Sequence, residues 1–229
     1  INWQYSNYVY STDSFATPIA DLSESIVSDE DSNERCGGDS LFTIIIQTED
    51  VGGSLHSFLR IIEGEDADLA WEVDLGETDE IKASPVVVDL DYDGKQEIIV
   101  SFDLSGTFYV KGYSPELICT VTGWSAGGSH VTELLWTYSD STLMIGSTDG
   151  PYVSSAYGGH KPTAQPLLAD LDLDGTAELV LSLIEKNSDD PVILALDITG
   201  TSATSIWEKT LDKGTHPSDP AFLQTDENT

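Results

Sequence analysis

The chain has 229 residues and a formal net charge of −32, because 41 acidic residues stand against only nine lysines and arginines. A surface of this sign repels nucleic acid and anionic membranes, so both are excluded as partners. No apolar run reaches the roughly 18 residues of a membrane span, and we expect none in this chain. High salt would screen the self-repulsion, which favours a halophilic source.

The first predicted element is a short strand that opens at a proline and ends at Asp-Leu, within Pro18–Leu22. An acidic insertion follows, in which Asp29, Asp31 and Asn33 alternate with other residues as metal ligands often do. The glycine of a tight ion-binding loop is missing there, so Asp29 and Asp31 are only a doubtful third ion site. An apolar run at Leu41–Gln47 then predicts a strand.

A second stretch repeats the proline and the Asp-Leu, and it continues into a longer acidic loop. The apolar runs Ser84–Val88 and Ile98–Phe102 enclose the loop Asp89–Glu97. Their β-branched residues, bounded by Pro, Gly and Asp, are typical of buried strands. Two further strands are predicted at Phe108–Tyr113 and Leu117–Val121.

The third stretch repeats this arrangement. The runs Gln165–Ala169 and Leu179–Ile184 enclose the loop Asp170–Glu178, and Val192–Leu196 predicts another strand. Because strands rather than helices flank both acidic loops, the sequence disfavours a helical EF-hand. Two acidic loops in the same local context indicate a repeated structural unit.

Both acidic loops carry carboxylates at positions 1, 3, 5 and 9 and a glycine at position 6. Such a loop supplies the many oxygens that a hard cation such as calcium prefers. The predicted side-chain ligands are Asp89, Asp91, Asp93 and Glu97 in the first loop and Asp170, Asp172, Asp174 and Glu178 in the second. The alternative is a solvated turn, but duplication between paired strands favours two ion sites of structural rather than catalytic role.

Tryptophans and prolines extend the repeat over the whole chain. Each of four tryptophans precedes a proline that opens the pattern: Trp3 and Pro18, Trp71 and Pro85, Trp136 and Pro166, Trp207 and Pro220. The units are approximately 3–70, 71–135, 136–206 and an incomplete 207–229, within a single region over 1–229. Units with short strands and no helical periodicity predict an all-β fold, a β-propeller of about three blades plus the start of a fourth. We expect it to be part of a larger propeller.

The pattern apolar-Asp-x-Asp-x-Asp-Gly-x-x-Glu-apolar-apolar resembles the calcium-binding repeat of FG-GAP and VCBS-type propellers, as in integrin α-subunit heads and many secreted microbial proteins. The resemblance covers nearly the whole chain as repeats, although only two units carry the full ion motif. It implies that the carbonyls of Lys95 and Thr176 complete the two calcium sites. It also implies a cell-surface or secreted protein.

The two cysteines, Cys36 and Cys119, lie in neighbouring units. They either pair in a disulfide, which would restrain the unfolded chain, or remain two buried thiols. Sequence provides no distance between them, so both alternatives stay open.

Four residues outside the acidic loops are candidate ligand-binding groups. Tyr152 and Tyr157 lie in the long segment before Pro166, where an insertion on a rigid scaffold could bind a glycan or a protein. His160 and His216 occupy similar places before successive prolines and could share a ligand or metal. Ordinary loop composition is the alternative for all four. Trp136 is assigned to packing between units.

The leading functional hypothesis is a non-enzymatic, calcium-stabilised extracellular propeller that acts in adhesion, surface assembly or glycan binding. Its partners would be a protein or glycan at the cell surface, or further copies of itself. The first alternative is a propeller enzyme, a polysaccharide lyase or a quinone-dependent dehydrogenase, although no catalytic motif is present and basic residues are scarce. The second is a subunit of an extracellular filament or surface layer.

Overall fold

The computed structural model describes residues 18–28, 36, 41–64, 67–80, 84–120, 123–125, 134–145, 166–188 and 190–211. These residues form β-strands and turns, with one short 3-10 turn, η1 (Ser23–Ser25). The predicted all-β class is therefore confirmed, while the propeller arrangement remains a prediction. In the described part of the chain, no helix is long and apolar enough to cross a membrane.

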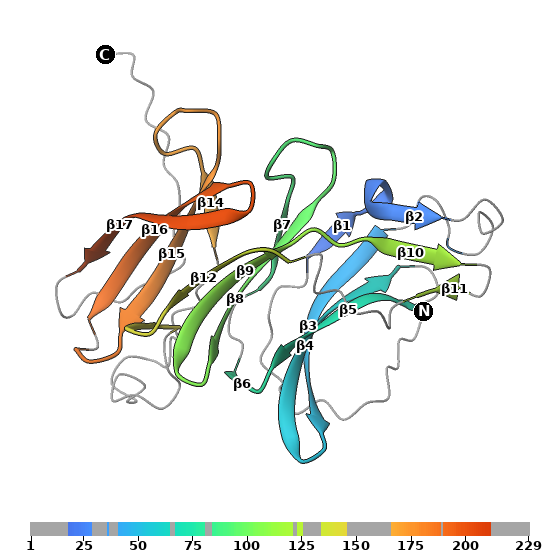
Figure 1. The fold of residues 1–229 in the computed structure, drawn as a ribbon, viewed down its shortest axis with the longest axis horizontal. Helices are drawn as coiled ribbons and strands as arrows, with labels where there is room; N and C mark the ends of the chain where they lie inside the picture. Colours follow the sequence, from blue (N-terminus) through green and yellow to red (C-terminus); the bar gives the residue numbers. More distant parts are fainter. Residues whose placement is uncertain are drawn as a thin grey trace.

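Three antiparallel sheets share one strand order, in which a three-residue strand pairs with the first of three longer strands (Figure 1). Sheet A contains β1 (Ile19–Asp21), β3 (Leu41–Val51), β4 (Ser54–Glu63) and β5 (Leu69–Gly76). Sheet C repeats this order with β7 (Val86–Val88), β8 (Glu97–Leu104), β9 (Thr107–Tyr113) and β12 (Leu134–Asp140). Sheet D repeats it with β14 (Leu167–Ala169), β15 (Glu178–Glu185), β16 (Pro191–Thr199) and β17 (Ser202–Thr210).

Two short strands extend sheets C and D at matching places. β6 (Thr78–Glu80) pairs with the end of β8, and β13 (Leu143–Met144) pairs with the end of β15. The sequence repeat thus corresponds to a repeat of strand order. The strands predicted from apolar runs are all present among the described residues. The longer runs form largely buried strands such as β8, β15 and β16, whereas β1, β7 and β14 are short edge strands of partial burial or exposure. Among the longer strands, β4, β5, β12 and β17 were not predicted, since polar residues interrupt their apolar pattern.

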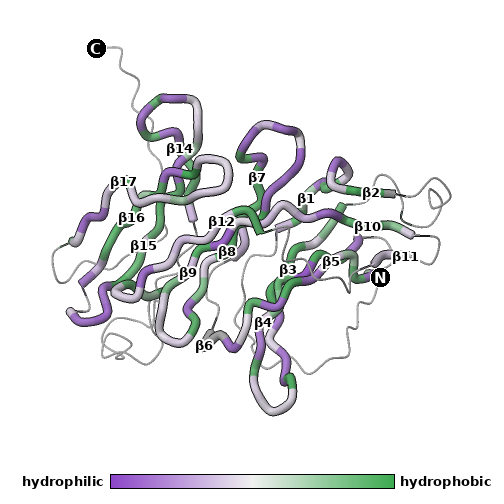
Figure 2. The backbone as a smooth tube through the Cα atoms, in the orientation of Figure 1, coloured by the Kyte–Doolittle hydropathy of each residue, from purple (hydrophilic) through white to green (hydrophobic). Residues whose placement is uncertain are grey.

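Alternation of side chains along the strands gives sheet C two buried faces. Odd and even positions of β8 point to opposite sides: Ile98 and Val100 contribute to a core shared with sheet A, whereas Ile99 contributes to a core shared with sheet D. The sheets therefore lie side by side in the order A, C, D, as Figure 1 shows from right to left. Figure 2 shows hydrophobic residues along the strands, for example β15 and β16, and mostly hydrophilic residues in the loops that follow β7 and β14.

A tryptophan occupies the same register position in all three sheets. Trp71 faces Ile61, Trp136 faces Gly112, and Trp207 faces Ala195 on the preceding strand. Trp71 and Trp136 are buried between sheets, which agrees with the predicted packing role of Trp136, whereas Trp207 is 42 % exposed. A Cβ atom at Gly112 would lie 2.4 Å from the Trp136 ring, so the indole occupies the space that glycine leaves free.

The outer face of sheet A is polar. Arg60, only 5 % exposed, donates hydrogen bonds to Gln47 at 2.7 Å, to Glu49 at 2.6 Å and to Glu72 at 3.0 Å, and its guanidinium lies over the Phe58 ring. Pairing with two carboxylates offsets the cost of burying this cation. The equivalent faces of sheets C and D pack on the preceding sheet instead.

A small fourth sheet, sheet B, joins units that are distant in sequence. It consists of β2 (Ile26–Ser28), β10 (Leu117–Thr120) and β11 (Gly123–Trp124), with β2 parallel to β10. Cys36 and Cys119 form a disulfide with their Cα atoms 6.1 Å apart, which decides between the two alternatives that sequence left open.

Candidate metal centre

The two acidic loops lie at the same place in sheets C and D. The first joins β7 to β8 and the second joins β14 to β15, and both project from the same rim of the molecule (Figure 1). Each starts directly after a three-residue strand and ends in the glutamate that opens the next strand. The repeat of strand order therefore places two similar carboxylate groups on one rim.

The backbone of each loop turns through the left-handed region twice. Tyr92 and Gly94 have φ angles of 59° and 93°, and Leu173 and Gly175 have φ angles of 62° and 95°. Positive φ is easy for glycine and costly for other residues, which explains the glycine at position 6. The non-glycine residues at position 4 adopt this conformation only because the rest of the loop imposes it.

Aspartate side chains hold the first loop in this shape. Gly94 N–H donates to Asp89 Oδ2 at 3.1 Å, Asp93 N–H to Asp91 Oδ1 at 3.2 Å, and Lys95 N–H to Asp93 Oδ1 at 2.7 Å. These contacts orient each carboxylate relative to the turn. They leave at least one oxygen of Asp89 and of Asp91 free of the loop backbone.

The second loop repeats the same hydrogen bonds. Gly175 N–H donates to Asp170 Oδ2 at 3.1 Å, Asp174 N–H to Asp172 Oδ1 at 3.2 Å, and Thr176 N–H to Asp174 Oδ1 at 2.8 Å. Two loops with different intervening residues thus reach one geometry, which the shared carboxylates and glycine determine.

The closing glutamate lies under the loop and is buried. Glu97 is 2 % exposed and accepts a hydrogen bond from Leu90 N–H at 2.7 Å. Glu178 is 1 % exposed and accepts one from Leu171 N–H at 2.5 Å. A single backbone donor is little compensation for a buried carboxylate.

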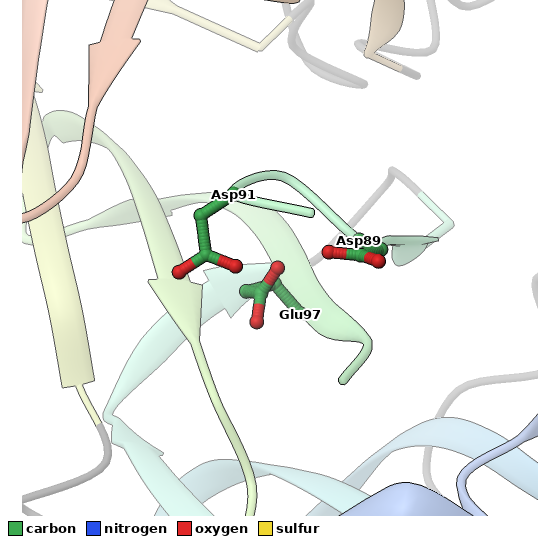
Figure 3. A group of neighbouring side chains, drawn as sticks. All are labelled: Asp89, Asp91 and Glu97. Atoms are coloured by element: carbon green, nitrogen blue, oxygen red, sulfur yellow. The ribbon is translucent and has the colours of Figure 1, made fainter. Parts of the chain in front are cut away.

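Three carboxylates of each loop converge on one point. The ligand atoms of Asp89, Asp91 and Glu97 all lie within 4.8 Å of one another, and so do those of Asp170, Asp172 and Glu178. Figure 3 shows the first group, with the Glu97 carboxyl between those of Asp91 and Asp89. Each group could hold a metal ion.

One oxygen in each group is buried without a hydrogen-bond donor: Asp89 Oδ1 in the first loop and Asp170 Oδ1 in the second. None of the ion pairs among the described residues reaches either group. A buried anionic oxygen without a partner is costly, and a bound cation would satisfy it.

The pKa shifts reflect the same excess of negative charge. Burial raises the pKa of Glu97 to about 7; the Leu90 N–H opposes this shift, and the three loop aspartates add to it. The same causes raise the pKa of Glu178. Each glutamate is therefore poorly tolerated as an anion unless a cation lies beside it.

The structure brings together six of the eight predicted side-chain ligands. Asp93 and Asp174 lie outside the converging groups; their Oδ1 atoms accept backbone hydrogen bonds from Lys95 and Thr176. Hydrogen bonds from Thr176 lower the pKa of Asp174, so this carboxylate stays ionised. That the Lys95 and Thr176 carbonyls act as ligands remains a prediction.

Sheet A lacks the equivalent carboxylate, in agreement with the sequence, in which only two units carry the full ion motif; which residue stands in its place was not predicted. The last residue before the loop aspartate is Val88 in sheet C, and it pairs with Glu97; in sheet D, Ala169 pairs with Glu178. In sheet A the residue before Asp21 is Ala20, which pairs with Phe42. Only strand register could reveal this substitution.

Several predicted site residues lie outside the described residues. They are Tyr152, Tyr157, His160, His216, Asp29 and Asp31.

Comparisons with protein-family models, curated proteins and solved structures found no match to this chain.

Proposed function

We propose that each acidic loop binds one calcium ion and that the chain is a calcium-stabilised, non-enzymatic module of an extracellular or cell-surface protein, acting in adhesion, surface assembly or glycan binding. The observation that carries the proposal is the pair of buried oxygens without donors, Asp89 Oδ1 and Asp170 Oδ1, in two loops of the same geometry. The same unsatisfied group at the same place in both loops is best explained by one kind of ligand that binds to each of them.

The donor set favours calcium over other cations. The converging groups offer carboxylate oxygens only, whereas zinc and later transition metals prefer nitrogen or sulfur ligands. Magnesium requires near-ideal octahedral geometry and retains several waters, while calcium accepts crowded, irregular carboxylates. Loops of this kind suit the millimolar calcium of extracellular fluids.

The ion would act as a structural link. β7 and β14 have only three residues each, and both are joined to their neighbours through a loop of mutually repelling carboxylates. A cation would relieve that repulsion and hold the short strand against β8 or β15. Its binding free energy would therefore add to the stability of the fold.

The repeated strand order supports a propeller of the FG-GAP or VCBS type. Sheets A, C and D each follow the order of one short and three longer antiparallel strands and pack face to face. Propeller blades have four antiparallel strands and stack in this way. The disulfide favours an oxidising compartment, in agreement with the proposed extracellular location.

Calcium binding can be measured directly by isothermal titration calorimetry after removal of bound ions with a chelator. We expect two ions per chain, one ion after Asp89→Asn or Asp170→Asn, and none after both changes. Glu116 is an exposed acidic residue on the loop before β10, so Glu116→Gln is the matched control. This variant should still bind two calcium ions. An unchanged stoichiometry in the double variant would refute the site assignment.

A further inference from the structure

Sheet A has an apolar residue at the register position where sheets C and D have the buried glutamate of a metal loop. Phe42 has the register position of Glu97 and Glu178, and its side chain has no exposed surface. A phenyl ring cannot bind a cation as a carboxylate does. The first sheet therefore needs another means of holding its short strand, β1.

The residues around Phe42 come from a distant part of the chain. The ring of Trp124, in β11, packs edge-on against Phe42 with centroids 5.7 Å apart. Leu22, directly after β1, belongs to the same buried cluster and is 1 % exposed. An apolar contact with sheet B thus stands where the other two loops have a cluster of carboxylates.

Hydrogen bonds and a covalent bond hold sheet B together, and its strand β2 continues the chain that leaves β1 of sheet A. β2 follows η1 almost directly after β1 and pairs in parallel with β10, in the register Ile26 to Leu117. Cys119, at the end of that register, is bonded to Cys36. The segment that leaves β1 is therefore connected to the segment that leaves β9 by the disulfide.

We infer that this disulfide-anchored sheet takes the place of the ion in sheet A, so that three equivalent short strands are held by two unrelated chemistries. β7 and β14 depend on a divalent cation, and β1 depends on an oxidised cysteine pair. The part that concerns sheets C and D rests on the function proposed above. Removal of calcium should open the short strands of sheets C and D, and reduction of the disulfide should open that of sheet A together with sheet B.

Reduction by dithiothreitol supplies the necessary electrons. The reagent transfers two electrons and two protons to the Cys36–Cys119 bond, which breaks to two thiols, while dithiothreitol closes to its cyclic disulfide. The experiment is hydrogen exchange of the whole chain, read by mass spectrometry of peptides, in four conditions: calcium or chelator, each with and without dithiothreitol.

With calcium present, reduction should accelerate exchange in β1, β2 and β10 by about tenfold or more and leave β14 and β15 unchanged, because local opening exposes only the amides it unpairs. Chelation without reduction should accelerate exchange in β14 and β15 and leave β1, β2 and β10 unchanged. The double change Cys36→Ser and Cys119→Ser should reproduce the effect of dithiothreitol and make the protein insensitive to it. If this variant does not fold, the reduced wild-type chain gives the same measurement.

Equal acceleration of β1 and β14 on reduction would overturn the inference, and so would unchanged protection of β1 and β2. If chelation affects no strand while reduction opens only β1, β2 and β10, the calcium proposal fails and the assignment of the disulfide to sheet A is supported.

Discussion

The chemistry of each loop depends on one glutamate that is almost completely buried. Glu97 and Glu178 each have one backbone donor and lie beneath aspartates of the same charge. A carboxyl group in this position is stable when protonated or when bound to a cation, and unstable as a free anion. The metal loop is therefore also a site where stability depends on pH.

Without calcium, the pKa of Glu97 is raised from 4.5 to about 7 in the folded protein. The protonated group contributes stability below the unfolded value, and this contribution is lost as the pH rises through about 7. The free energy of unfolding in chelator should therefore fall as the pH rises from 4 to 8. Urea unfolding in chelator, at several pH values, measures it.

Glu97→Gln mimics the protonated group, so two effects of opposite sign are expected. In chelator at pH 8 the variant should equal or exceed the wild type in free energy of unfolding, and in calcium it should be less stable. Glu116→Gln should follow the wild type in both. If the free energy of unfolding in chelator changed with pH equally in wild type and Glu97→Gln, the raised pKa of Glu97 would be contradicted.

At the level of elements, packing between sheets depends on a small residue opposite a tryptophan. Gly112 lies under Trp136 where sheets C and D meet, and a Cβ there would lie 2.4 to 2.7 Å from three ring atoms. In sheet D the equivalent residue is already Ala195, opposite the partly exposed Trp207. The tolerance for a methyl group thus differs between equivalent positions.

Gly112→Ala should lower the free energy of unfolding by about 1–3 kcal/mol, because Trp136 must leave its preferred position in a dense core. The matched change Ala195→Gly removes the same methyl group where the tryptophan is less confined, and should cost at most about 1 kcal/mol. Thermal or urea unfolding of both variants is the measurement. A smaller loss for Gly112→Ala than for Ala195→Gly would show that the ring moves freely.

At the level of the whole molecule, the acidity far exceeds the needs of the metal loops. Two calcium ions would supply four positive charges against a net charge of −32. Most of the self-repulsion is therefore spread over the surface and falls with ionic strength rather than with calcium. Salt and calcium should stabilise the protein by separate routes.

Sodium chloride at molar concentration should raise the melting temperature of the wild type and of the Asp89→Asn, Asp170→Asn double variant by similar amounts. Millimolar calcium should raise that of the wild type by several degrees and leave the double variant unchanged, since binding to the folded state alone stabilises it. Differential scanning calorimetry in chelator, in calcium and in salt separates the stabilisation by calcium from the stabilisation by salt. If calcium still raised the melting temperature of the double variant, its effect would come from screening of surface charge and not from binding at the two loops.

The sequence by itself determined the features that depend on neighbouring residues. The strands β7, β8, β14 and β15 are apolar runs, and the turn between each pair follows from aspartates and a glycine at fixed spacing, so strands, loops and candidate ligands were all predictable. The identity of the ion and the propeller arrangement are not tested by these features and remain proposals.

Only the tertiary structure decided what depends on contacts between distant segments. Strand register placed Phe42 where Glu97 and Glu178 lie in the other sheets, and chain folding brought Cys36 to Cys119. The burial of Trp136 and the exposure of Trp207 likewise depend on which sheet packs against each. Local spacing fixes the shape of a loop, but register and packing are properties of the assembled sheets, because partners far apart in sequence determine them.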